Sequence, residues 1–140
     1  VNFVFRNQIS DNMKSMEFGD LDCLLVNTTG ELKSFYKEAT VVFIGKSLKA
    51  KGGQNPVEPA ALAKPIIFGP NMGNFEEITE KFLSNEAALQ VADEFELEKA
   101  IELLINDQSK RNALGKAAQK VVQENDGAVE KTAAMILSTI

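Results

Sequence analysis

The segment spanning residues 45–55 carries the side chains with the clearest capacity for binding chemistry. It contains Ser47, the adjacent glycines Gly52 and Gly53, and Asn55, and a proline-led helix start follows it. Paired glycines let a backbone approach a ligand without a Cβ atom in the way, and the N–H groups at a helix start attract anions. The segment therefore predicts a site for a phosphate group.

Charged residues lie within this segment and just after it. Lys46 and Lys51 could each add a cation, and Glu58 falls in the first turn of the following helix, where a carboxylate can accept hydrogen bonds from the hydroxyls of a ribose. The same residues also fit a plain turn and helix cap, with Glu58 closing a capping box to Asn55, so local chemistry leaves both interpretations open. The segment has neither the Gly-Lys-Ser/Thr of a Walker loop nor the Gly-x-Gly-x-x-Gly order of dinucleotide folds.

Two other segments resemble it in position. Residues 69–75 and residues 28–31 each follow a predicted strand and precede a predicted helix. Ligands of open α/β sheets bind beyond the carboxyl ends of the strands, so we expect the three helix starts to converge at one sheet edge. Segment 69–75 also fits a simple strand-to-helix turn.

The elements that must position these loops alternate along the chain. Short apolar runs predict strands at about residues 1–5, 23–26, 41–44, 66–68 and 88–92. A cap residue followed three positions later by glutamate predicts helix starts at Thr28, Asn55, Asn74 and Asp93. The chain is helical from Asp93 onward, and Asp126-Gly127 predicts a break before a last helix over residues 128–139. The pattern indicates an α/β fold with an open, doubly wound parallel sheet and C-terminal helices, in a single domain over residues 1–140.

Composition excludes several function classes. The net charge of −5 offers no broad attraction for duplex nucleic acid, and no apolar run approaches the roughly 20 residues of a membrane-spanning helix. The single cysteine, Cys23, excludes an internal disulfide, and the absence of histidine removes the commonest zinc ligand. We therefore expect no metal centre and no cofactor.

Taken together, these segments resemble a known family. The residues that carry the resemblance are Gly52-Gly53-Gln54-Asn55-Pro56-Val57-Glu58-Pro59-Ala60-Ala61-Leu62, Lys64-Pro65-Ile66-Ile67-Phe68-Gly69-Pro70-Asn71, Asn74-Phe75, Thr28-Thr29-Gly30-Glu31-Leu32, Phe35-Tyr36, Val41-Val42-Phe43-Ile44-Gly45 and Asn125-Asp126-Gly127-Ala128. This ordered set is similar to the C-terminal half of the 3-deoxy-D-manno-octulosonic acid (Kdo) transferases of lipopolysaccharide synthesis, over about residues 23–130.

The resemblance implies one Rossmann-like half of a GT-B glycosyltransferase, the half that binds the sugar-nucleotide donor CMP-Kdo. Ser47, Gly52, Gly53 and Asn55 would then hold the phosphate and Glu58 the ribose. Gly30 and Glu31 would line the same cleft, and Arg6 would match an arginine that follows an early strand in the family.

The resemblance also implies parts that lie outside this sequence. The chain opens inside a strand-like run at Val1, so we expect a fragment that is inactive alone. The acceptor domain for the lipid A precursor, a membrane anchor and the catalytic carboxylate would all precede it, and the full-length protein would act at the cytoplasmic face of the bacterial inner membrane.

Four positions depart from the family pattern: Lys46 stands at a usual glycine, Gln54 and Asn71 at frequent histidines, and Asn27 at a frequent aspartate. Two alternatives therefore remain beside the first interpretation. One is a GT-B domain for another nucleotide sugar. The other is a non-catalytic α/β module of receiver type, although such a module needs an acidic cluster at its strand ends, where this chain has Asn27, Lys46 and Gly69.

Overall fold

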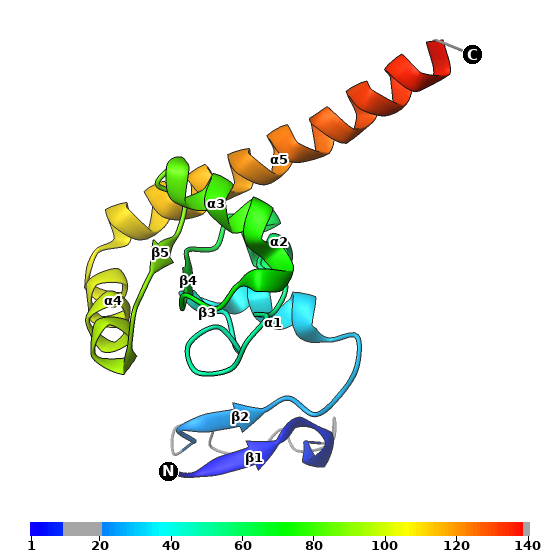
Figure 1. The fold of residues 1–140 in the computed structure, drawn as a ribbon. Coiled ribbons are helices and arrows are strands. Elements are labelled where there is room, and N and C mark those ends of the chain that lie inside the picture. The colour runs from blue at the N-terminus through cyan, green and yellow to red at the C-terminus, as the bar shows by residue number, and fades with distance from the viewer. Residues whose placement is uncertain (10–20, 139–140) are drawn as a thin grey trace. The chain divides into compact units, whose positions relative to one another are not determined.

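The computed structural model describes residues 1–9 and 21–138, and for residues 127–138 it describes the helical backbone alone. Its backbone contacts divide the chain into two compact units, Val1–Phe35 and Tyr36–Ile140, which are described separately below. Figure 1 shows the order of the elements. The assignment of residues 1–140 to a single domain stays a prediction.

The first unit contains a pair of parallel strands. Strand β1 (Phe3–Phe5) pairs with β2 (Cys23–Leu25), with Phe3 opposite Cys23 and Phe5 opposite Leu25. The short 3-10 helix η1 (Arg6–Gln8) follows β1 directly. The two strands predicted in this part of the chain are thus confirmed, each slightly shorter than expected.

Helix α1 (Leu32–Glu38) begins at the end of this unit, three residues after Thr29, the first helical residue that a cap at Thr28 predicts. Glu31 is the residue that precedes the helix, and its carbonyl accepts the N–H groups of Ser34 and Phe35. The predicted start at Thr28 is wrong because Gly30 has φ +87°, a backbone conformation incompatible with a right-handed helix.

The second unit is built on a three-stranded parallel sheet. Its strands β3 (Val42–Phe43), β4 (Ile66–Phe68) and β5 (Leu89–Gln90) lie in the order β3-β4-β5. Helix α2 (Val57–Ala61) connects β3 to β4, whereas the 3-10 helix η3 (Gly73–Phe75) and helix α3 (Glu76–Ser84) connect β4 to β5. Helices α4 (Glu94–Asn106) and α5 (Gln108–Ser138) complete the unit (Figure 1).

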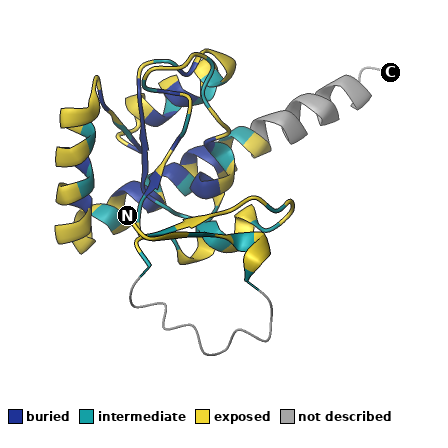
Figure 2. Ribbon diagram, turned by 90° about the horizontal axis from the view of Figure 1, so that it is seen from below, coloured by how far each residue is buried: buried dark blue, intermediate teal, exposed yellow. Residues whose placement is uncertain are grey.

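Both faces of this sheet are covered. All three residues of the central strand β4 are 0% exposed (Figure 2). Ile66 and Phe68 belong to a core cluster with Phe82 of α3 and Val121 of α5, whereas Ile67 belongs to a second cluster with Leu104 of α4. Because alternate side chains of a strand point to opposite faces, the helices lie on both sides of the sheet, and the predicted doubly wound α/β class is confirmed.

Of two further predicted helix caps, one agrees with the structure and one does not. The predicted cap at Asp93 is confirmed, since its carboxylate accepts the N–H groups of Phe95 and Glu96. The predicted cap at Asn74 is wrong, because Asn74 lies inside η3 and α3 begins at Glu76 with no capping side chain. The 3-10 turn replaces the cap at this helix start.

The predicted break at Asp126-Gly127 is also wrong. Helix α5 runs without interruption from Gln108 to Ser138, so no separate helix starts at residue 128. A glycine inside a helix costs only about 1 kcal/mol relative to alanine, and the last proline of the chain is Pro70, so nothing in this region forbids the helix from continuing.

Candidate functional site

The loops that follow β3 and β4 lie against each other. Backbone and side-chain hydrogen bonds join them: the Asn71 N–H donates to the Ser47 carbonyl (2.9 Å), the Asn71 amide to the Leu48 carbonyl (2.8 Å), and the Asn74 N–H to the Gly52 carbonyl (3.1 Å). The expected convergence of segments 45–55 and 69–75 is therefore confirmed. Segment 28–31 belongs to the first unit, and its convergence with these loops stays a prediction.

Ser47 is the most deeply buried polar residue of this region. It is 0% exposed; its hydroxyl donates to the Ile44 carbonyl (2.5 Å) and accepts the Gly69 N–H (2.8 Å). The hydroxyl is thus occupied in tying together the ends of β3 and β4. The predicted contact of Ser47 with a phosphate stays a prediction, and the structure gives this residue a positioning role.

Backbone conformation and close packing both require glycine at positions 52 and 53. Gly52 and Gly53 have φ +103° and +69°. A Cβ atom on Gly52 would lie 2.7 Å from the Asn74 amide nitrogen, and one on Gly53 would lie 2.4 Å from the Met72 sulfur. Side chains of the neighbouring loop thus already occupy the space that a Cβ atom would need. This packing alone explains why both positions are glycine, without a ligand.

Asn55 and Glu58 are the exposed polar pair at the end of the same loop. The side-chain oxygen Oδ1 of Asn55 accepts the Val57 N–H (3.0 Å), and the side-chain Nδ2 of Asn55 donates to the Glu58 carboxylate (3.4 Å). Helix α2 starts at Val57, one residue later than predicted, and is only five residues long, so its dipole contributes little to anion binding. Anion affinity in this region has to come from side chains and loop amides.

The carboxylate of Glu58 also affects Tyr36. Partial burial raises the pKa of the Tyr36 hydroxyl above its ordinary value of 10.0, and the negative charge of Glu58 raises it further. A negative charge close to a tyrosine hydroxyl disfavours the tyrosinate. Glu58 is also the residue at which the sequence predicts a ribose contact.

The other three predicted site residues lie together in the first unit. Arg6 forms an ion pair with Glu31 at 2.8 Å, and the hydroxyl of Thr28 donates to the other oxygen of the same carboxylate. The Thr28 hydrogen bond, and to a smaller extent Arg6, hold the pKa of Glu31 below its ordinary value of 4.5. Gly30 sits between these partners with nothing within 4 Å of where its Cβ would be.

Hydrogen bonding of Asn71 to Leu48 was not anticipated from the sequence. The side-chain amide of Asn71 anchors one loop to the other. The sequence places Asn71 in the candidate loop of residues 69–75 but does not indicate this partner. No periodicity or cap spacing marks such a residue, because its partner is a backbone carbonyl more than twenty positions away in the chain.

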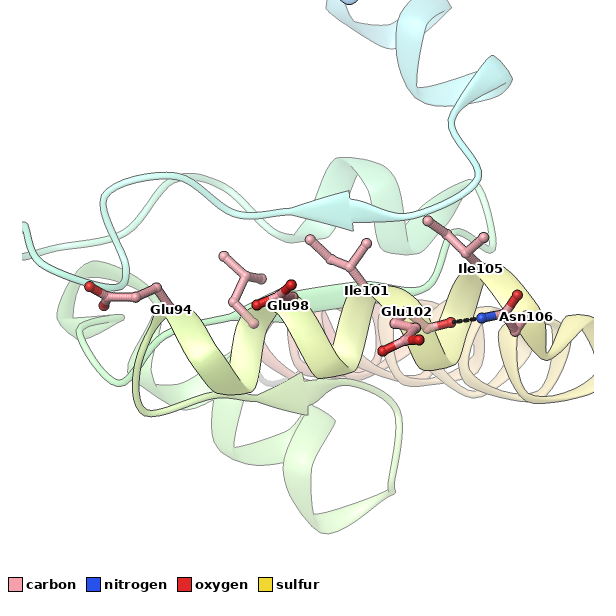
Figure 3. Close-up of a pocket in the computed structure, with 7 residues that line it drawn as sticks. Glu94, Glu98, Ile101, Glu102, Ile105 and Asn106 are labelled. Carbon is pink, nitrogen blue, oxygen red and sulfur yellow. Dashed lines mark hydrogen bonds between the residues drawn. The ribbon is translucent and has the colours of Figure 1, made fainter.

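Helix α4 borders a hollow of about 590 Å³ (Figure 3). Leu97, Ile101 and Ile105 form an apolar row there, and Glu94, Glu98 and Glu102 form an acidic row beside it. All lining residues come from one helix, and the acidic row repels anions. This hollow is therefore a poor site for a phosphate-bearing ligand.

Two searches of the described part of the chain bear on other classes of site. No helix among residues 1–9 and 21–138 is long and apolar enough to span a bilayer. Across the same residues, no group of three or more histidine, cysteine, aspartate or glutamate side chains is arranged to hold a metal ion.

Curated relatives share one described activity. The chain is 37% identical over 109 residues to the 3-deoxy-D-manno-octulosonic acid transferase of Haemophilus influenzae, a match that covers 77% of this chain and 26% of that protein. It is 34% identical over 113 residues to the enzyme of the same name from Bordetella pertussis, with 80% and 26% covered. The chain thus spans about a quarter of the length of these relatives.

A solved structure shares the fold. The C-terminal CMP-Kdo binding domain of WaaA from Acinetobacter baumannii superposes with a TM-score of 0.77 at 26% sequence identity, over 88% of this chain and 62% of that one. The family described as glycosyl transferases group 1 matches residues 9–121, which rules against the receiver-type module. On these grounds the chain belongs to the glycosyl transferases group 1 family.

Proposed function

We propose that this chain is the donor-binding part of a Kdo transferase and that it binds CMP-Kdo at the loops following β3 and β4. The observation that carries the proposal is its likeness, over 88% of the chain, to a domain described as binding CMP-Kdo. The names of the relatives at 34–37% identity point to the same sugar. The larger protein would transfer Kdo to a lipid A precursor at the cytoplasmic face of the bacterial inner membrane, with acceptor binding supplied outside this chain.

In this proposal the predicted site residues have different roles. Gly52, Gly53 and Asn55 border the phosphate, and Glu58 accepts hydrogen bonds from the ribose hydroxyls. Ser47 acts through the backbone that it holds in place, since its own hydroxyl is already bonded to Ile44 and Gly69.

The residues of the first unit would complete the cleft. Arg6, Gly30 and Glu31 lie together, and the ion pair between Arg6 and Glu31 fixes both side chains. The proposal assigns them to the wall of the donor site. It also treats residues 1–140 as one domain that is inactive alone, because the base that activates the acceptor hydroxyl would come from elsewhere in the protein.

The reaction would be a transfer with inversion at the anomeric carbon of Kdo. The acceptor hydroxyl attacks that carbon, the bond to the phosphate oxygen breaks, and CMP leaves with the bonding electrons. Donors in this chain would stabilise the negative charge that develops on the leaving phosphate.

Binding of nucleotides tests the proposal directly. Calorimetric titration of the chain with CMP-Kdo, CMP and UMP should give measurable affinity for the two cytidine ligands and weaker affinity for UMP. The Glu58→Gln variant should bind CMP about three- to tenfold more weakly, as expected when a charge-assisted hydrogen bond to ribose becomes a neutral one. The Glu80→Gln variant, on the exposed surface of α3, provides a matched control that should bind CMP as the wild type does.

A second candidate donor is another nucleotide sugar. A glutamate that binds ribose does not read the base, so the Glu58 contact would serve a uridine nucleotide equally well. Tighter binding of UMP than of CMP would favour this candidate and overturn the assignment to CMP-Kdo.

A further inference from the structure

In the described part of the chain, three residues other than glycine have left-handed backbone angles. They are Lys46 (φ 55°), Ala63 (φ 54°) and Glu86 (φ 51°). A Cβ atom is disfavoured in this conformation, and glycine is the residue that relieves it.

Two of the three are explained by helix ends. Ala63 follows α2, and the Lys64 N–H donates to the Pro59 carbonyl (3.1 Å). Glu86 follows α3, and the Ala87 N–H donates to the Phe82 carbonyl (2.7 Å). Both are Schellman motifs, in which a left-handed residue satisfies the last carbonyls of a helix.

The left-handed conformation of Lys46 is not explained by a helix end, because Lys46 lies in the loop after strand β3. Its backbone is held from both sides: its carbonyl accepts the Gly53 N–H (3.1 Å), and the next residue, Ser47, is buried and bonded to Ile44 and Gly69. A glycine would make these backbone contacts without strain. The turn therefore requires a left-handed backbone at position 46, but it does not require a lysine side chain. Backbone strain at a residue other than glycine often marks a functional position.

The side chain of Lys46 is exposed, and no hydrogen bond or ion pair to it occurs within the described residues. Its neighbour Lys49 differs, because Lys49 pairs with Glu94 at 3.1 Å. Lys46 also borders a hollow of about 420 Å³, whose wall includes Phe43, Leu48 and Ala50. Lys49 and Glu94 line the same hollow, and their opposite charges offset each other in the ion pair, so Lys46 supplies the excess positive charge there. The hollow thus combines an apolar wall, with Phe43 37% exposed, and an unpaired cation at the carboxyl end of β3.

A sugar acid matches this combination. Its ring offers C–H groups to an apolar wall, and its carboxylate offers a partner to an ammonium group. CMP-Kdo carries two acidic groups, the phosphate and the carboxylate of the sugar. We propose that the hollow beside Phe43 receives the sugar of the donor and that Lys46 binds its carboxylate, an assignment that rests on the proposed function.

This assignment makes Lys46 a specificity residue. It contributes to the affinity for the complete donor and not to that for CMP, which lacks the sugar carboxylate. The assignment also predicts that Lys46→Gly raises stability and weakens donor binding, because the substitution relieves the backbone strain and removes the ammonium group.

Affinity for CMP-Kdo and for CMP, measured by calorimetry on the 140-residue chain, separates these effects. Lys46→Gly and Lys46→Met should weaken CMP-Kdo binding by about fivefold or more and change CMP binding by less than about twofold, whereas Lys46→Arg should retain donor affinity. Lys46→Gly should also raise Tm by about 2–4 °C.

Two matched controls isolate the causes. Ala63→Gly relieves the same backbone conformation at a helix end and should raise Tm without affecting either ligand. Lys99→Met removes an exposed positive charge from α4 and should leave both affinities unchanged.

Each other result is decisive. Wild-type affinity for CMP-Kdo in both Lys46→Gly and Lys46→Met overturns the inference and leaves the proposed function standing. An equal loss for CMP and CMP-Kdo assigns Lys46 to the phosphate and overturns the carboxylate contact. A wild-type chain that binds neither ligand refutes the proposed function, and the inference with it.

Discussion

The hydroxyl of Ser47 joins the ends of two neighbouring strands by accepting the N–H of Gly69 over 2.8 Å. The two residues are also in direct backbone contact, because a Cβ atom on Gly69 would lie 2.3 Å from the Ser47 carbonyl oxygen. The loops that carry Gly52, Gly53 and Asn71 start from this junction. Its integrity therefore sets the shape of the candidate site.

Removing the hydroxyl should destabilise the second unit. The Ser47→Ala variant leaves the buried Gly69 N–H without its acceptor, which costs about 1–3 kcal/mol in the free energy of unfolding. Chemical denaturation measures this loss. Ser34→Ala, on the exposed surface of α1, is the matched control and should change stability by less than about 0.5 kcal/mol. Equal stabilities of the two variants would contradict the role assigned to the junction.

Asp93 and Asn74 distinguish a real helix cap from an apparent one. Asp93→Ala removes the acceptor of two N–H groups at the start of α4 and should cost about 1 kcal/mol. Asn74→Ala should cost less than about 0.5 kcal/mol, because the Asn74 side chain caps no helix. Urea denaturation of both variants checks the difference, and a larger loss for Asn74→Ala would refute it.

These two residues also show how far sequence patterns extend. The cap-to-glutamate spacing is identical at Asp93 and at Asn74, and only the structure distinguishes them, because Asn74 is drawn into a 3-10 turn whose backbone bonds to Gly52. The strands were predictable because β4 and its neighbours are short apolar runs, and a strand buried on both faces needs no alternation.

The candidate site was predictable in part. The glycines and the helix start mark the loop of residues 45–55, but the spacing of residues does not reveal that Ser47 is buried or that Asn71 binds Leu48. Both facts depend on which loops meet across the sheet. The left-handed conformation of Lys46 was not predictable either, because a lysine in the sequence gives no local indication of a positive φ angle.

The ionisation of Glu31 should report its contact with Thr28. Its pKa in the folded chain lies below the ordinary 4.5, so the contacts of its carboxylate stabilise the fold fully above about pH 4.5 and lose their contribution as pH falls through the folded pKa. Thr28→Val removes the largest cause and should raise the pKa of Glu31. NMR titration of the side-chain carboxyl carbon measures the change, and an unchanged pKa would show that Thr28 does not bind the carboxylate.

Tyr36 offers a direct probe of Glu58. It is the only tyrosine in the sequence, which also lacks tryptophan, so the ultraviolet absorbance of tyrosinate reports Tyr36 alone. Glu58→Gln should lower the pKa of Tyr36 and still leave it above 10.0, because burial is the larger cause of the shift. Glu38→Gln, an exposed change on α1, serves as the comparison. A Tyr36 pKa that does not respond to Glu58→Gln would place the carboxylate farther away.

The most direct test of the account follows the backbone amides of the labelled chain during titration with CMP, UMP and inorganic phosphate. The account predicts that CMP selectively shifts the amides of Gly52, Gly53, Asn55 and Glu58, with UMP and phosphate producing smaller changes. Amides that stay unmoved by CMP, or that respond equally to all three ligands, would contradict the assignment of these loops to a cytidine sugar donor.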